Sequence, residues 1–251
     1  RHLVVASGFS RVPRRISWPG LDAFAGPVLH SAEYANGDRF RGQRVLVVGF
    51  GNSGAEIALD LAEHRADSTV SIRGAVTDVP RTILGVPITH LGRAGGVLPL
   101  AVADRINRVI VRLALGNLDQ YGLRKRSDGP LAEIVRTRQI PVVDVGTLGA
   151  IRAGRIAVRP AIDSSMHEAV RFADGRVETF HAIVLATGYD TGLDALFGNA
   201  ASLLDDDGRP HVADDKAASG LYFCGFRIVP AGLLGEIARE APRIAAKIVA
   251  A

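Results

Sequence analysis

The feature that most constrains this chain is a glycine-rich turn between a short apolar run and an amphipathic segment. Residues 45–48 are all apolar, and the turn Gly49-Phe50-Gly51-Asn52-Ser53-Gly54 follows them directly. Residues 53–63 have the apolar spacing of a helix, and residues 68–73 alternate polar and apolar side chains as a strand does. Strand, helix and strand within about 30 residues form the βαβ unit of a parallel sheet. The sequence therefore predicts an α/β, Rossmann-like fold.

The spacing of the three glycines predicts a dinucleotide site. The first glycine permits a tight turn, the second lets the backbone approach a pyrophosphate, and the third lets the helix pack closely on the strand. The N-terminus of the helix adds free N–H groups and a partial positive charge. Because a strand and a helix flank the motif, a merely glycine-rich turn is the weaker alternative. The predicted cofactor-binding residues here are Gly49, Phe50, Gly51, Asn52, Ser53 and Gly54.

Two side chains of the turn are open to two roles. Asn52 and Ser53 stand at the expected start of the helix. Either could hydrogen-bond the nicotinamide side of a cofactor or cap the helix, and capping is the role we expect for Ser53.

Arg73, at the end of the second predicted strand, favours NADP over NAD. Enzymes that use NAD usually place an acid about 20 residues after the glycines to hold the ribose 2′-hydroxyl. No Asp or Glu occurs in the stretch VSIRGA, where Arg73 stands instead. A guanidinium can hold a 2′-phosphate bidentately, so we predict that Arg73 binds NADP. The alternative is an ordinary surface arginine.

Charge, hydropathy and cysteine content limit which partners and which cellular location we expect. With 30 basic and 26 acidic residues the net charge is only +4, and no basic run alternates with aromatic residues, so we expect no nucleic-acid partner. No apolar run approaches the roughly 18 residues that span a bilayer, so we expect no stable membrane insertion. The single cysteine, Cys224, allows no internal disulfide and favours a reducing cytoplasm. No metal site and no catalytic acid or base is predicted.

The rest of the chain suggests two interleaved domains. Residues 3–6 and the stretches AIVL and LYFC predict buried strands, Asp174-Gly175 predicts a two-residue hairpin turn, and residues 100–115 predict a helix. A closing helix is expected to follow Gly232. We expect the following division: residues 1–35 as a remnant of an FAD-binding domain, residues 36–189 as an NADP-binding domain with a helical insertion at about 74–140, and residues 190–251 as the C-terminal part of the FAD-binding domain. Because Arg1 stands directly before a strand, we expect the chain to lack its true beginning.

Several stretches resemble one family. Phe24-x-Gly26-x-x-x-His30-x-x-x-Tyr34 resembles the fingerprint of the flavin-containing monooxygenases, and it stands just before the glycine turn as in that family. The stretches GFGNSGAE, VLATGYD and GLYFCGF resemble further family motifs, in the family's order. The chain is most similar to the YUCCA-like branch, and the similarity covers nearly its whole length.

The resemblance implies an FAD- and NADPH-dependent monooxygenase with two dinucleotide-binding domains. In that family NADPH reduces the flavin, whose C4a-hydroperoxide oxygenates a small organic substrate; an aryl α-keto acid is the substrate class of the YUCCA-like branch. The resemblance also implies further cofactor-binding residues. These are Ala186, Thr187 and Gly188 of the linker strand, and Gly232 and Gly235 before the closing helix.

The family's first glycine motif, which binds FAD, is not in this sequence. We therefore expect the partner to be either the missing FAD-binding half or a second copy of the chain, besides the substrate and O2. The alternative function is a non-catalytic NADP-binding fragment. A flavin-linked disulfide reductase is disfavoured because Cys224 has no second cysteine to pair with.

Overall fold

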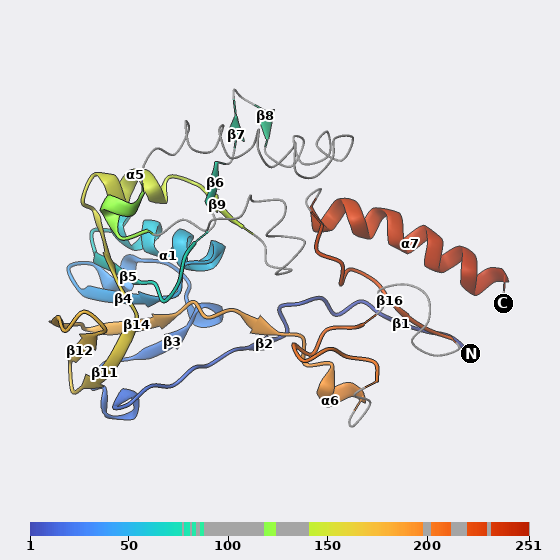
Figure 1. The fold of residues 1–251 in the computed structure, drawn as a ribbon, viewed down its shortest axis with the longest axis horizontal. Helices are drawn as coiled ribbons and strands as arrows, with labels where there is room; N and C mark the ends of the chain where they lie inside the picture. The colour runs from blue at the N-terminus through green and yellow to red at the C-terminus, as the bar shows by residue number, and fades with distance from the viewer. Residues whose placement is uncertain are drawn as a thin grey trace.

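The computed structural model describes most of the chain in two connected parts (Figure 1). The described residues are 1–76, 118–123, 141–197, 202–211, 220–229 and 232–250, together with the backbone of 78–80, 82–83 and 86–87. The helix predicted at residues 100–115 lies outside them.

A five-stranded parallel sheet forms the larger part, in the order β10-β5-β4-β14-β3. Its strands are β3 (Val28–His30), β4 (Arg44–Val48), β5 (Asp67–Ser71), β10 (Ile156–Arg159) and β14 (Ala182–Leu185). The strand order reverses between β4 and β14, and such a switch point is where open α/β sheets bind ligands. The predicted α/β, Rossmann-like fold is confirmed. The edge strand β3 comes from residues before the expected domain boundary at residue 35.

The sheet is covered on both faces. Alternate residues of β4 point to opposite sides, so that Val45 and Val47 join one apolar core and Leu46 and Val48 the other. The helices α1 (Asn52–Glu63) and α5 (Thr147–Arg152) cover the first face. A three-stranded antiparallel sheet covers the second; its strands are β11 (Ile162–Met166), β12 (Ala169–Phe172) and β13 (Val177–Thr179).

The predicted hairpin is confirmed, but its loop is one residue longer than expected. The N–H of Phe172 donates to the carbonyl of Arg176, which leaves residues 173–175 in the loop. Gly175 has a φ of 86°, the left-handed conformation of a three-residue hairpin loop. The position of the turn was predicted correctly, whereas the length of its loop was not.

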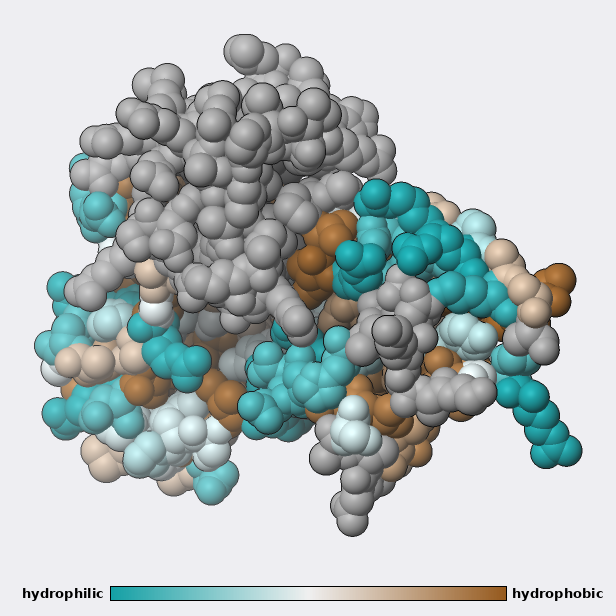
Figure 2. Space-filling model, turned by 45° about the vertical axis from the view of Figure 1, so that its right-hand side comes forward, coloured by the Kyte–Doolittle hydropathy of each residue, from teal (hydrophilic) through white to brown (hydrophobic). Residues whose placement is uncertain are grey.

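The second part is built on β1 (Leu3–Val5) and β16 (Leu221–Phe223), which pair in parallel. Val5, Leu193, Phe223 and Phe226 form its core. The long closing helix α7 (Leu233–Ala250) lies beside these strands, with its N-terminal end turned toward the larger part (Figure 1). Its outer surface is mostly hydrophilic (Figure 2). The strands and the closing helix predicted for this region are confirmed.

Two chain segments cross between the parts. They form a short antiparallel ribbon of β2 (Val12–Pro13) and β15 (Tyr189–Asp190). The remaining elements are short, namely β6 (Asp78–Pro80), β7 (Thr82–Ile83), β8 (Val86–Pro87), β9 (Val142–Asp144), α6 (Asp194–Phe197), and the 3-10 helices η1 (Leu21–Ala23), η2 (Ser31–Glu33), η3 (Asp38–Phe40) and η4 (Asp119–Tyr121).

Candidate dinucleotide-binding site

The glycine turn lies at the switch point of the parallel sheet, and each glycine has its own surroundings. Gly49 has a φ of 104°, and a Cβ there would lie 2.6 Å from the carbonyl oxygen of Ala186. A Cβ on Gly54 would lie 2.2 Å from the carbonyl oxygen of Gly49. A Cβ on Gly51 would meet no heavy atom within 4 Å among the residues that the structure describes. Packing within the protein therefore requires the first and third glycines, whereas the second leaves open space where a ligand can approach.

Gly51 is the N-cap of α1, and no side chain caps the helix there. Ser53 lies inside the helix and is exposed, so the predicted capping role of Ser53 is wrong. An N-terminus without a side-chain cap keeps its N–H groups available to an anion. Phe50 is buried at 8% exposure and holds the turn against the core.

The side chain of Asn52 is engaged with the protein's own backbone. Its Nδ2 donates to the carbonyl of Pro141 at 3.3 Å, and its Oδ1 accepts from the N–H of Val143 at 2.8 Å. These bonds join the start of α1 to β9. The capping role considered for Asn52 is wrong as well, because its amide is directed to this neighbouring segment.

Arg73 lies on the same edge of the sheet as the turn. It follows β5 by two residues, and β5 pairs in register with β4 through Ser71 and Val48. The N–H of Gly49 donates to the carbonyl of Ser71 at 3.0 Å, which ties the turn to the end of that strand. Arg73 is exposed. The predicted strand ends earlier than expected, so that Arg73 stands in the connection after it.

The linker residues Ala186, Thr187 and Gly188 lie next to the turn. The N–H of Ala186 donates to the carbonyl of Val48 at 2.9 Å, and its carbonyl faces Gly49. Thr187 donates its hydroxyl to the carbonyl of Arg14, whose own N–H donates to the carbonyl of Gly188 at 3.0 Å. This segment therefore borders the site and also fixes one of the two crossing segments.

Two fingerprint residues, His30 and Tyr34, hydrogen-bond neighbouring elements beside the site; we call this pair the clasp. His30 is fully buried; its Nδ1 accepts from the N–H of Ala32 at 3.1 Å, so its Nε2 carries the hydrogen and donates to the carbonyl of Gly188 at 3.0 Å. The hydroxyl of Tyr34 donates to Asp60 of α1 at 2.6 Å. Burial and this carboxylate raise the pKa of Tyr34. The clasp joins β3, the linker and α1, and it aligns the elements that carry the turn.

The last two predicted residues lie in the second part. Gly232 has a φ of 90° and donates its N–H to the carbonyl of Val229 at 3.0 Å, directly before α7. Gly235 lies in the first turn of that helix. Both are therefore placed at the N-terminal end of α7, separately from the glycine turn (Figure 1).

Neither a metal site nor a membrane-spanning helix is found among the described residues. No group of three or more His, Cys, Asp and Glu side chains in them is arranged to hold a metal ion. No helix in them is long and apolar enough to cross a membrane. Cys224 is free and buried, and burial raises the pKa of its thiol.

An ionic cluster at the start of α7 was not predicted from the sequence. Glu236 is only 5% exposed and pairs with Arg227 at 3.2 Å and with Arg239 at 2.6 Å. The spacing of Glu236 and Arg239, three residues apart on an amphipathic helix, was the available signal. The contact with Arg227 depends on how the chain returns from β16.

Comparisons with known proteins agree with this architecture. A family model described as flavin-binding monooxygenase-like matches residues 2–200. An indole-3-pyruvate monooxygenase, YUCCA1 of Oryza sativa subsp. japonica, is 39% identical over 241 residues, which cover 94% of this chain and 58% of that protein. A probable indole-3-pyruvate monooxygenase, YUCCA1 of Arabidopsis thaliana, is 37% identical over 251 residues, covering 98% and 60% respectively. The chain thus spans 58–60% of the length of these curated relatives.

Solved structures share the fold at lower identity. A flavin-containing monooxygenase from Stenotrophomonas maltophilia aligns with a TM-score of 0.67 at 21% identity, over 100% of this chain and 63% of that one. An oxidized steroid monooxygenase bound to NADP aligns with a TM-score of 0.68 at 17% identity, over 99% and 60%.

Proposed function

The chain belongs to the flavin-binding monooxygenase-like family, and on that premise we propose that it binds NADP at the glycine turn as part of an FAD- and NADPH-dependent monooxygenase. The substrate we propose is a small organic molecule of the aryl α-keto acid class. Two similar proteins, 37–39% identical, are named for indole-3-pyruvate, which is such an acid.

The observation that carries the proposal is the open space at Gly51. The turn offers a backbone approach at an uncapped helix N-terminus, and no heavy atom of the described residues lies within 4 Å of where a Cβ would stand. Such a terminus suits a pyrophosphate, because its N–H groups and the helix dipole both favour an anion. Arg73 stands on the same sheet edge, where its guanidinium can reach a ribose 2′-phosphate.

The chain's own residues bind and orient the cofactors in this proposal. Bound NADPH supplies the hydride and bound FAD the oxygen-transfer chemistry. The glycine turn and Arg73 hold NADPH, and Ala186–Gly188 limit the site on the β14 side. Gly232 and Gly235 lie at a helix N-terminus that fits a flavin approaching closely. A flavin half supplied by residues outside this sequence would complete the FAD site. A cytoplasmic location is consistent with the single cysteine.

Exchanging Arg73 tests the cofactor assignment. We expect Arg73→Ala to lose about 10- to 100-fold in affinity for NADP+ and almost none for NAD+, because only NADP+ carries the 2′-phosphate. Calorimetric titration with both nucleotides measures the difference. Arg171→Ala, an exposed arginine on β12 of the opposite layer, is the matched control. Equal losses for both nucleotides, or no loss, would contradict the role of Arg73.

The alternative, a non-catalytic NADP-binding fragment, is favoured by the presence of a single GxGxxG motif in the sequence. The flavin spectrum of the purified 251-residue chain separates the two. Flavin absorbance that persists through gel filtration supports FAD binding by these residues. A colourless protein that binds NADP+ supports the fragment.

A further inference from the structure

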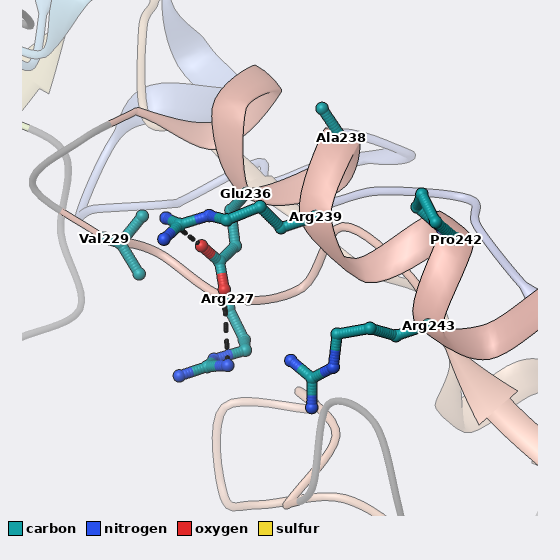
Figure 3. A pocket seen from close by; sticks show the side chains of 7 residues that line it. All are labelled: Arg227, Val229, Glu236, Ala238, Arg239, Pro242 and Arg243. Carbon is teal, nitrogen blue, oxygen red and sulfur yellow. Dashed lines mark hydrogen bonds and ion pairs between the residues drawn. The ribbon is translucent and has the colours of Figure 1, made fainter. Parts of the chain in front are cut away.

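A pocket of about 520 Å³ opens beside the first turns of α7 (Figure 3). Its charged lining consists of Arg227, Arg239, Arg243 and Glu236. Val229 and Pro242 add apolar surface. A cavity of mixed lining with convergent cations suits a small organic anion that has an apolar body.

Among the described residues that line the pocket, Arg227 and Arg239 outnumber the one acid that they contact, Glu236. The carboxylate of Glu236 is shared between two guanidinium groups: one oxygen pairs with Arg227 and the other with Arg239. Arg243 also lines the pocket. Among the described residues of the lining, Arg227 and Arg239 therefore share a single carboxylate, that of Glu236. Each guanidinium carries five N–H donors in a planar fork, and the recorded pairing with Glu236 uses only part of that capacity.

Arg227 and Arg239 are held in place by an ion pair and are also accessible to a ligand in the pocket. Glu236 is 6% exposed at its side chain, whereas the side chains of Arg227 and Arg239 are 45% and 65% exposed. Glu240, one turn further along α7, accepts from the N–H of Gly225 at 2.7 Å and so fixes the segment from which Arg227 projects. Glu236 thus holds one side of each fork, and both arginines line the pocket.

The pocket lies close to the proposed flavin side. Glu236 follows Gly235 directly, and Arg239 is four residues beyond it, which is about 6 Å along a helix. The N-terminal end of α7 is the end turned toward the nucleotide-binding sheet (Figure 1). A ligand held by these arginines would therefore lie near the helix start where we place the flavin.

We propose that Arg239 and Arg227 bind the carboxylate of the organic acid substrate in this pocket. The inference rests on the proposed function, which supplies the substrate class. Arginine suits the task because its planar fork matches the two oxygens of a carboxylate. The apolar part of the lining then accommodates carbon atoms next to the carboxylate.

Two ligands that differ only in the carboxylate provide the test. Phenylpyruvate and phenylacetone share the aryl group and the ketone, and phenylacetone lacks the carboxylate. Both are titrated calorimetrically into the 251-residue chain, together with NADP+ as a third ligand. We expect phenylpyruvate to bind at least about tenfold more tightly than phenylacetone, because charge-assisted hydrogen bonds contribute that much or more.

Arg239→Gln is the primary variant, because its side chain is 65% exposed and its loss should not prevent folding. It should weaken phenylpyruvate binding about tenfold or more and leave phenylacetone and NADP+ unchanged. Arg239→Lys keeps the charge without the fork and should lie between the two. Arg171→Gln on β12 removes an equal charge elsewhere and should change nothing.

Several results would overturn the proposal. One is that phenylpyruvate binds no better than phenylacetone. Another is that Arg239→Gln lowers the thermal stability but keeps phenylpyruvate affinity within twofold, which would make the cluster a structural clamp. If Arg239→Gln weakens NADP+ and not phenylpyruvate, the pocket holds a cofactor phosphate instead. A chain that binds NADP+ through Arg73 but shows no carboxylate preference would overturn this inference and leave the proposed NADP binding at the glycine turn intact.

Discussion

Two glycines of the turn can be separated by experiment, because the structure gives them different tasks. Gly51 has φ −93° and ψ −172°, an extended conformation that any residue adopts, and a Cβ there meets no atom of the described part of the chain within 4 Å. Replacing glycine by valine at an N-cap costs about 1 kcal/mol, and restricting the unfolded chain returns about 0.4–1 kcal/mol. We therefore expect Gly51→Val to change the free energy of unfolding by less than about 1 kcal/mol.

The same variant should nevertheless lose the nucleotide. A valine side chain would fill the space through which a pyrophosphate reaches the N–H groups of α1. Loss of several charge-assisted hydrogen bonds corresponds to about 100-fold or more in affinity. NADP+ titrated calorimetrically into Gly51→Val should therefore give no measurable binding at concentrations that saturate the wild type.

Gly54→Ala is the matched comparison, because it adds a smaller group at a closed position. The new Cβ would stand 2.2 Å from the carbonyl oxygen of Gly49, so α1 has to move away from the turn by about 1 Å. Overpacking of this kind costs about 1–3 kcal/mol, and the better helix propensity of alanine returns about 1 kcal/mol. Because both colliding groups belong to the backbone, we expect a net loss of about 1–2 kcal/mol in the free energy of unfolding by urea.

The two variants together test whether Gly51 serves ligand binding and Gly54 serves packing. Binding by Gly51→Val within a few-fold of the wild type would refute the ligand role of the open space. A loss of stability in Gly51→Val as large as that in Gly54→Ala would refute the division of tasks between the glycines.

Two further predictions concern residues that contact α1, namely Tyr34 of the clasp and His64 at the C-terminal end of the helix. Tyr34→Phe removes a 2.6 Å hydrogen bond to a carboxylate and should lower the free energy of urea unfolding by about 1–2 kcal/mol; an unchanged midpoint and slope would contradict the clasp. The pKa of His64 is raised, first by its hydrogen bond to the backbone of Asp60 and then by the carboxylates of Asp60 and Asp38. A raised folded pKa stabilises the protein below the unfolded pKa of about 6.5, and this contribution disappears as the pH rises through the folded value. The stability difference between wild type and His64→Gln should therefore be largest below the unfolded pKa of about 6.5 and shrink as the pH rises above it in urea titrations, and a difference that grows would show the opposite sign.

Local features of the fold were predictable because their causes are local. A glycine turn, an apolar strand before it and an amphipathic helix after it require only neighbours in sequence, and β4 and α1 form as expected. The Asp174-Gly175 turn likewise gave the hairpin. Its loop length was missed, since two- and three-residue loops both place glycine in the left-handed conformation.

Contacts between distant segments were not predictable from spacing. Asn52 hydrogen-bonds to the backbone of Pro141 and Val143, 89 and 91 residues away. No pattern in the local sequence predicts these partners. The strand β3 joins the sheet beside β14, whose residues come about 150 positions later, although the domain division had assigned it elsewhere. Arg227 meets Glu236 only because the chain turns back from β16 into α7.

The fingerprint shows why a pattern can mark a function without naming what its residues do. His30 lies in a family motif next to the proposed cofactor site, yet both ring nitrogens are occupied by backbone groups. A fully buried imidazole held in this way cannot contact a nucleotide, but it fixes the carbonyl of Gly188, in the same linker segment whose Ala186 carbonyl faces Gly49. The motif therefore acts through geometry: it sets the position of the linker, and the linker sets the position of the turn. Residues of this kind can be found by resemblance, whereas their role becomes visible only when the partners of each polar atom are known.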